Sequence, residues 1–302
     1  SMKEELAGAW TRLEALQKHD GSLRGVSTGF PALDNLLSGF QKSDLIILAA
    51  RPSVGKTTLA LDIARHTAVK HKNAVGIFSL EMSAQQLTDR MLASQSNVNS
   101  WKLPVGTPPS DADYEALQNG IVALPEAPIF IDDKPGATVL SMRSVARRLK
   151  IEKDLKLLVI DYLQLIIPSA SRASDSTVQQ VTEISRALKG LARELDIPVV
   201  ALSQLSRAVE QRGGRPRLSD LRDSGSIEHD ADVVMFIHRE DMTGNRTEHV
   251  ERTNVTHILV EKHRNGPIGT VELLFDDEKT TFRTIETNDY SSIAPAANGD
   301  PF

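Results

Sequence analysis

Short runs of apolar residues alternate with segments of helical periodicity over most of the chain. Six such runs occupy residues 44–50, 74–81, 127–133, 155–161, 197–204 and 231–238. The segments between them carry helical patterns, the longest over residues 177–196. A strand that is buried on both faces is apolar along its whole length, and a helix is the usual crossover between two parallel strands. The pattern therefore predicts an α/β fold, with a mostly parallel sheet and helices on both faces.

The pattern changes at both ends of this region. Residues 253–276 form two apolar segments around Asn265-Gly266, which indicates a C-terminal β-hairpin. Residues 4–18 have the spacing of an amphipathic helix, with leucine or tryptophan at positions 6, 10, 13 and 16. This helix either packs on its own domain or docks on a neighbouring subunit, and the residues alone favour neither alternative.

These boundaries predict three segments. Residues 1–26 are a linker helix and connector, residues 27–287 one α/β domain, and residues 288–302 a disordered tail. Ser1 before Met2 is typical of a tag remnant, so the sequence is consistent with part of a longer protein.

Composition narrows the function classes. The chain of 302 residues is 40% hydrophobic and 25% charged, which is ordinary for a globular protein. No apolar run approaches the ~18 residues that cross a bilayer, and there is no cysteine for disulfides or thiolate metal sites. We therefore expect a cytoplasmic protein without a membrane segment. Because the formal net charge is −5, any nucleic-acid binding must come from a local basic patch or from several subunits.

A phosphate-binding loop is the strongest chemical signal. The segment ILAARPSVGKTT ends in Gly55-Lys56-Thr57 between a predicted strand and a predicted helix, as the P-loop pattern G-x-x-x-x-G-K-[ST] requires. Backbone N–H groups at the helix start would bind phosphate, Lys56 would reach the β- and γ-phosphates, and the Thr57 hydroxyl would bind Mg²⁺. The predicted nucleotide-binding residues are Ser53, Val54, Gly55, Lys56, Thr57 and Thr58.

The loop departs from the pattern at its first position, where Ala50 stands in place of glycine. This alanine is tolerable if position 50 needs neither a positive φ nor close approach to phosphate, whereas Gly55 is hard to replace. A chance Gly-Lys-Thr at a helix start is the alternative, and the flanking strand and helix argue against it.

Two carboxylates would complete a hydrolytic site. Asp161 ends the run 155–161, where a P-loop ATPase needs an acidic residue for the Mg²⁺ water shell. Glu81 ends the run 74–81, at the carboxyl edge where ligands of open α/β sheets gather, and would polarise the attacking water. Taken alone, Glu81 is equally a helix-start glutamate stabilised by the helix dipole. Its pairing with Asp161 favours the catalytic role.

Further polar residues follow the later strands. Gln204 comes just after a strand and would sense the γ-phosphate, unless it is an ordinary strand-end glutamine. The arginine-rich loop 206–232 suits a nucleic-acid backbone, although such a run is more often a solvated loop. Lys262 and Arg264 lie two residues apart and would point to one face at the hairpin tip. They would reach the γ-phosphate of a neighbouring subunit as an arginine finger, or simply be solvated.

Taken together, these residues resemble the RecA-like ATPase domain of the DnaB-type replicative helicases. The resemblance covers residues 27–286, and the helix 4–18 also fits. It is carried by the motifs STGFPALDNLLSGF, ILAARPSVGKTT, FSLEMS, VIDYLQLI, ALSQLSR, LSDLRDSGSIEHDAD and EKHRNGPIGTVELLF. That family also has alanine at the first P-loop position. The resemblance implies a RecA-like P-loop NTPase fold.

The function that the resemblance implies is a homohexameric ring that hydrolyses ATP with Mg²⁺ at its subunit interfaces. Such a ring moves 5′-to-3′ along single-stranded DNA and unwinds the duplex at the replication fork, with primase and a helicase loader as partners. The family's helical N-terminal domain is not found upstream of the linker helix, which leaves open whether this chain forms a ring by itself.

The resemblance also implies roles for individual residues. By motif position, the phosphate and metal ligands are Lys56, Thr57 and Asp161, the catalytic glutamate is Glu81, the sensor is Gln204, and the residues acting in trans are Lys262 and Arg264. Arg90 falls where the family has an arginine near the nucleotide. The loop that holds the DNA backbone corresponds to Arg222, Asp223, Ser224 and Gly225, with Asp223 where glutamate is common.

Two other interpretations belong to different classes. A recombination mediator on the same scaffold would bind DNA as a filament, but the motifs DYLQL and RDSGSIEHDAD argue against it. A non-hydrolysing module that docks a loader or primase is disfavoured by the full set of catalytic residues.

Overall fold

The computed structural model describes most of the predicted α/β domain. It covers residues 23–100, 110–168, 176–206, 214–221, 225–240 and 254–285, with the single residues Met2, Leu6, Trp10, Val209 and Arg212. Leu6 and Trp10 are helical, as predicted for the helix 4–18, and both side chains are exposed; the other residues of this helix lie outside the described part. The predicted tail, residues 288–302, also lies outside it.

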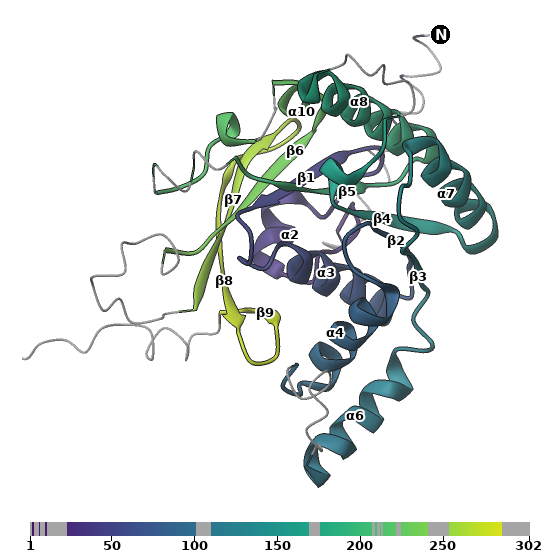
Figure 1. Ribbon diagram of the computed structural model, residues 1–302, viewed down its shortest axis with the longest axis vertical. Coiled ribbons are helices and arrows are strands. Elements are labelled where there is room, and N and C mark those ends of the chain that lie inside the picture. The colour runs from purple at the N-terminus through teal and green to yellow at the C-terminus, as the bar shows by residue number, and fades with distance from the viewer. Residues whose placement is uncertain are drawn as a thin grey trace, which may run out of the picture.

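A nine-stranded sheet forms the centre of the described chain, in the order β3-β2-β4-β5-β1-β6-β7-β8-β9 (Figure 1). The strands are β1 (Leu45–Ala50), β2 (Ala74–Ser79), β3 (Ile129–Asp132), β4 (Leu155–Asp161), β5 (Val199–Gln204), β6 (Val233–His238), β7 (Val255–His263), β8 (Gly269–Asp276) and β9 (Thr281–Thr284). All pairs from β3 to β6 are parallel, and those from β6 to β9 are antiparallel. Each of the six apolar runs is therefore a parallel strand, and the predicted hairpin is β7–β8.

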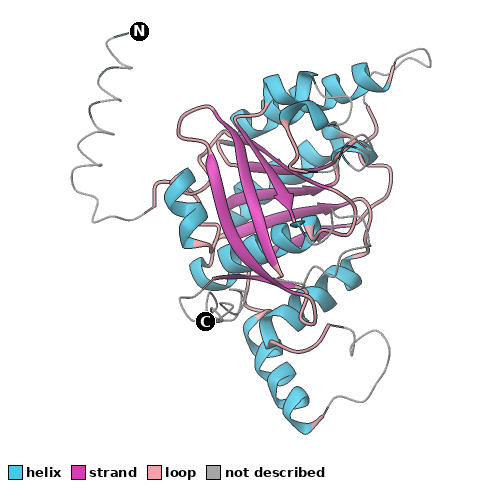
Figure 2. Cartoon of the chain, turned by 90° about the vertical axis from the view of Figure 1, so that its left-hand side faces the viewer, coloured by secondary structure: helices cyan, strands magenta, loops and turns pink. Residues whose placement is uncertain are grey.

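Helices cover both faces of this sheet (Figure 2). They are α2 (Pro31–Leu37), α3 (Lys56–His71), α4 (Ala84–Ser96), α6 (Asp111–Ala123), α7 (Val139–Lys153), α8 (Thr177–Leu195) and α10 (Gly225–Asp230), with 3-10 turns η1 (Leu163–Leu165) and η2 (Leu218–Asp220). Capping boxes at Ser83, Ser110, Thr138 and Ser176 begin α4, α6, α7 and α8, since each side chain accepts a hydrogen bond from the first helical turn. The sequence did not predict α2, α6 or β9.

The core consists of two apolar layers, one on each side of the sheet. Ile46 and Leu48 of β1 face the layer that contains α3, while Leu45 and Ile47 face the layer that contains α7 and α8. All four side chains are fully buried. Because alternate residues of a strand point to opposite faces, a strand between two helical layers must be apolar at every position. This is why the parallel strands appear in the sequence as continuous apolar runs.

The topology opens a crevice at the carboxyl ends of the central strands. The chain leaves β1 into α3 on one face of the sheet, whereas it leaves the adjacent strand β5 toward α10 on the other face. In open α/β sheets, ligands bind at such a divergence. The fold therefore places the P-loop, which follows β1, at the expected binding edge.

Candidate functional site

The P-loop connects β1 to α3, and its backbone conformation depends on Gly55. Gly55 caps the start of α3 with a φ of 101°, in the region that favours glycine. A Cβ atom at this position would also lie 3.0 Å from the ring of Phe282. Ala50 is the last residue of β1, where it pairs with Gln204 and Ile237 in extended conformation. The structure thus agrees that alanine is tolerated at position 50 and that glycine is needed at position 55.

Lys56, Thr57 and Asp161 form a polar cluster beneath the loop. The Thr57 hydroxyl donates to Asp161 Oδ2 at 2.7 Å, and Lys56 Nζ lies 3.8 Å from Asp161 Oδ1. The ammonium group also lies 4.3 Å from the centre of the Tyr162 ring, a cation–π distance. Burial lowers the pKa of Lys56, and the carboxylates of Asp161 and Glu81 counteract the shift. The cluster therefore combines a partly desolvated cation with a buried carboxylate.

Asp161 also has a carboxylate oxygen available for a metal. The residue is 2% exposed, and Oδ1 is buried without a hydrogen-bond partner among the described residues. Leaving a buried carboxylate oxygen unsatisfied is costly, whereas Mg²⁺ prefers oxygen ligands and keeps several waters or phosphate oxygens. The Thr57 hydroxyl and the Asp161 carboxylate therefore fit the chemistry of a Mg²⁺ site.

Most of the predicted residues from the carboxyl edge of the sheet share one cleft of about 420 Å³, whereas Val54 and Asp161 are buried and are not among its lining residues. Its lining includes Ser53, Gly55, Lys56, Thr57, Thr58, Glu81, Arg90 and Gln204. Glu81 is exposed and follows β2 by two residues, so it lies beyond the strand rather than in it. The Gln204 N–H donates a long hydrogen bond to Gln164 Oε1 at 3.4 Å, and Gln164 Nε2 donates to the Gln204 carbonyl at 3.5 Å. The fold therefore gathers residues from α3, α4, β5 and the segment after β2 that are far apart in sequence.

One wall of the cleft was not predicted from the sequence. Phe275 and Thr280, from the β8–β9 region, also line the cleft. Phe282 of β9 packs on Phe275 with ring centres 4.8 Å apart and contacts Gly55. These aromatic residues carry no motif, so only their positions in the folded sheet connect them with the site.

Asp62 of α3 attaches that wall to the helix after the P-loop. Its carboxylate accepts hydrogen bonds from the Thr281 hydroxyl at 2.9 Å, the Phe282 N–H at 2.8 Å and the Ser94 hydroxyl at 3.0 Å. Burial raises the pKa of Asp62, and Arg65 opposes the shift. Because Phe282 touches Gly55, this network holds the wall against the loop.

Lys262 and Arg264 lie at the opposite end of the parallel strands, the amino edge, because the end of β7 pairs with the start of β6, Lys262 with Val234. Both side chains reach α10, where Lys262 Nζ donates to the Glu228 carbonyl and Arg264 Nη2 to the His229 carbonyl at 3.2 Å. The sequence predicted that Arg264 lies in the strand with Lys262. In the structure β7 ends at His263, so Arg264 is the first residue after the strand. This edge contains the amino ends of β1 and β6, and β1 alone separates it from the P-loop by about 20 Å. The two cations cannot reach the P-loop of their own chain.

The remaining predicted site lies largely outside the described residues. Of the loop Arg222, Asp223, Ser224 and Gly225, only Gly225 is described, as the first residue of α10.

A membrane-spanning helix is not found in the described part of the chain, since each helix there is too short or too polar for that role.

Comparison with known sequences identifies close relatives. The family model of the DnaB-like helicase C terminal domain matches residues 25–284. The replicative DNA helicase DnaB of Geobacillus stearothermophilus is 48% identical over 301 residues, which cover 98% of this chain and 65% of that protein. The replicative DNA helicase DnaC of Bacillus subtilis (strain 168) is 46% identical, with the same coverage of 98% and 65%. The chain thus spans only part of the length of these relatives.

Solved structures agree with this likeness. One of them, an isolated ATPase domain, has a TM-score of 0.87 and 37% identity, over 95% of this chain and 99% of that one. A DnaB-like replicative helicase, solved in a study of its interactions with primase, has a TM-score of 0.84 and 37% identity, over 95% of this chain and 67% of that one. The RadB recombinase, at a TM-score of 0.52 and 18% identity, shares the fold alone. The predicted RecA-like α/β fold is confirmed.

Proposed function

Because the chain belongs to the family of DnaB-like helicase C-terminal domains, we propose that it is the ATP-hydrolysing motor of a replicative DNA helicase. The single observation that carries the proposal is the cleft that contains Lys56, Thr57, Glu81 and Gln204 beside a buried Asp161. These residues come from four separate strand ends or helices, and together they supply the parts that P-loop hydrolysis needs.

Each residue of the cleft has a distinct role in this proposal. N–H groups of residues 53–58 and the Lys56 ammonium hold the phosphates of ATP. Thr57 and Asp161 would hold Mg²⁺, which when bound neutralises charge on the β- and γ-phosphates. Glu81 polarises the attacking water, for which its exposed position at the cleft is suitable. Gln204 and Arg90 contact the nucleotide from the neighbouring strand and helix.

The site needs a second subunit in this proposal. Lys262 and Arg264 are the cations that would stabilise charge on the γ-phosphate, yet they lie at the far edge of their own sheet. A ring of identical subunits in head-to-tail contact brings one edge of each chain to the opposite edge of the next. This arrangement supports a homohexamer in which Lys262 and Arg264 act in trans.

The remaining partners follow from the family. Arg222, Asp223, Ser224 and Gly225 would hold single-stranded DNA, along which the ring moves 5′-to-3′ in the cytoplasm. Residues 1–26 would link neighbouring subunits through the helix 4–18. A loader and a primase are the expected protein partners, and a similar solved helicase was studied for its interactions with primase.

The test is ATP hydrolysis with and without single-stranded DNA. We expect DNA to stimulate the rate, and Glu81→Gln to reduce it by about 100-fold or more while nucleotide binding persists. Glu152→Gln, an exposed residue of α7 away from the cleft, is the matched control. Hydrolysis that ignores DNA would contradict the helicase function, and filaments in place of rings in electron micrographs would favour a recombination mediator.

A further inference from the structure

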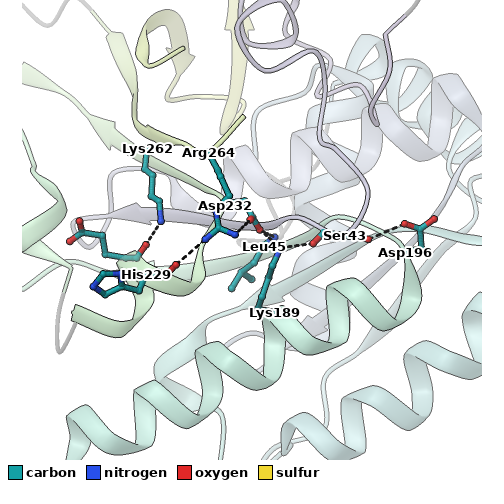
Figure 3. A network of polar contacts seen from close by, with 9 residues as sticks. Ser43, Leu45, Lys189, Asp196, His229, Asp232, Lys262 and Arg264 are labelled. Atoms are coloured by element: carbon teal, nitrogen blue, oxygen red, sulfur yellow. Dashed lines mark hydrogen bonds and ion pairs between the residues drawn. The ribbon is translucent and has the colours of Figure 1, made fainter. Parts of the chain in front are cut away.

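Asp232 lies between the proposed trans-acting arginine and the strand that leads to the P-loop (Figure 3). The residue directly precedes β6 and is 2% exposed. Its Oδ1 lies 2.9 Å from Arg264 Nη1, and its backbone carbonyl accepts the Arg264 N–H at 2.8 Å. Its Oδ2 accepts the N–H of Leu45 at 2.9 Å and a hydrogen bond from Lys189 Nζ. One buried carboxylate thus contacts the arginine, α8 and the first residue of β1.

The guanidinium of Arg264 is held on two sides. Asp232 takes Nη1, and the His229 carbonyl at the end of α10 takes Nη2. A planar guanidinium with two fixed contacts has a defined orientation, and it retains further N–H donors for another ligand. Since 49% of the Arg264 side chain is exposed, those donors are accessible from outside the protomer.

Asp232 also balances the positive charge at this edge. Burial lowers the pKa of Lys262, and the nearby Arg264 lowers it further, while Asp232 acts in the opposite direction. Two cations that must meet a phosphate together repel each other when they are brought close. The buried carboxylate of Asp232, which also pairs with Lys189, reduces the repulsion between Lys262 and Arg264.

We propose that Asp232 is a positioning residue, which orients Arg264 toward the nucleotide bound to the next subunit and ties that arginine to the start of the P-loop strand. This inference rests on the proposed function, because it assumes that Arg264 acts in trans. In this proposal, the Asp232 carboxylate connects the two nucleotide sites to which each protomer contributes. The link runs from Arg264 through Asp232 to Leu45, and along β1 to the P-loop.

Asp232→Asn tests the proposal, because the amide keeps the shape and removes the charge. We expect kcat for ATP hydrolysis to fall about tenfold while KM changes less than about twofold, since the cleft that binds ATP lies at the other edge. In an Arg264→Ala background, where the arginine is already absent, the same substitution should cause no further fall in single-turnover rate. A purely structural role would lower the rate in both backgrounds.

Two control variants separate the contacts of Asp232. Asp196→Asn makes the same chemical change at the same edge, on an exposed residue that hydrogen-bonds Ser43, and kcat should not change. Lys189→Met removes the other ion-pair partner of Asp232 but leaves Arg264 in place. We expect it to lower the melting temperature and to keep kcat within about twofold of wild type. If Lys189→Met matches Asp232→Asn in kcat, the effect comes from the fold and the proposal is overturned.

The outcomes also distinguish this proposal from the proposed function. Wild-type rates in Arg264→Ala would refute the trans-acting arginine, and with it the premise. If Arg264→Ala is inactive but Asp232→Asn lowers the rate further in that background, the role of Asp232 alone is refuted. A raised KM in Asp232→Asn would refute it as well. Should Asp232→Asn fail to fold, Asp232→Glu keeps the charge and displaces the guanidinium by about one methylene. A wild-type kcat in that variant would also overturn the proposal.

Discussion

The two edges of the parallel sheet differ in how their charges are satisfied. At the carboxyl edge, Asp161 Oδ1 is buried without a hydrogen-bond partner among the described residues, and burial lowers the pKa of Lys56. At the amino edge, the carboxylate of Asp232 contacts Lys189, Arg264 and a backbone N–H. The carboxyl edge is therefore suited to a charged ligand, whereas the amino edge has cations whose positions are fixed by Asp232. Under the proposed function, a complete site would combine the carboxyl edge of one copy of the chain with the amino edge of the next.

The energetic cost of each arrangement is also different. At the carboxyl edge, the Asp161 carboxylate has one hydrogen bond from Thr57 and the Lys56 ammonium at 3.8 Å, so its desolvation is compensated less fully than that of Asp232. A buried carboxylate with two cations and an N–H group compensates its own desolvation. Under the proposed function, ATP and Mg²⁺ would complete the compensation at the carboxyl edge, whereas the amino edge is preorganised by folding.

The strongest test of this comparison mixes two inactive variants. Lys56→Ala removes the P-loop cation at the carboxyl edge, and Arg264→Ala removes the proposed trans-acting arginine at the amino edge. Each substitution should reduce ATP hydrolysis by about 1000-fold. In mixed rings at equal ratio, about a quarter of the interfaces combine an intact P-loop with an intact arginine, so activity should partly return. Native mass spectrometry must show that the rings are mixed. Mixed rings without any recovery would show that the two edges do not meet.

Asp161→Asn tests the metal site at the carboxyl edge. The amide is a weaker ligand for Mg²⁺ than the carboxylate, so the Mg²⁺ concentration for half-maximal ATP hydrolysis should rise more than about tenfold. Asp133→Asn is the control, because Asp133 follows β3 at the same edge and accepts a hydrogen bond from the Ala84 N–H. An unchanged Mg²⁺ requirement in Asp161→Asn would exclude this carboxylate as a metal ligand.

Two glycine substitutions compare a strained position with an unstrained one. Gly55→Ala places a side chain at a φ of 101° and against Phe282, and should lower the free energy of unfolding by about 1–3 kcal/mol. It should also weaken the binding of a fluorescent ATP analogue. Gly190→Ala, in α8 with open space around the site, should raise the free energy of unfolding by about 0.5–1 kcal/mol. Urea denaturation measures both, and equal effects would contradict the loop geometry.

The smallest expected effect concerns Asp44 at the amino edge. Burial, together with the nearby Asp232, raises the pKa of Asp44 to about 6 against the opposing effect of Lys189, His263 and Arg264. The folded state therefore binds a proton more tightly than the unfolded state, and stability is lost as the pH rises from about 4 through 6.

Asp44→Asn removes this titration. Relative to wild type, the variant should gain about 1 kcal/mol of unfolding free energy between pH 4 and pH 7, after allowance for solvent screening. Urea denaturation of both proteins across this range measures the gain. A difference that stays constant with pH would show that Asp44 does not titrate in this window.

Much of the fold could be predicted because burial on both faces leaves a continuous apolar signal. The six parallel strands and the hairpin β7–β8 appeared where the sequence indicated them. The short elements were missed for a physical reason. Helix α2 has seven residues and β9 has four, which is too little for a periodicity to emerge. Helix α6 is largely exposed and packs on α4, so it lacks a clear apolar face.

The sequence by itself determined the local chemistry of this protein. Gly55, Lys56 and Thr57 belong to a loop whose conformation is encoded within a few residues, and Asp161 was predicted from its place at a strand end. Tertiary structure alone decided which distant residues meet. It placed Phe282 beside Gly55, buried Asp161 Oδ1 without a hydrogen-bond partner in the described part of the chain, and joined Asp232 to Arg264 at the amino edge of the sheet. Such contacts depend on strand order and packing, which no local pattern records.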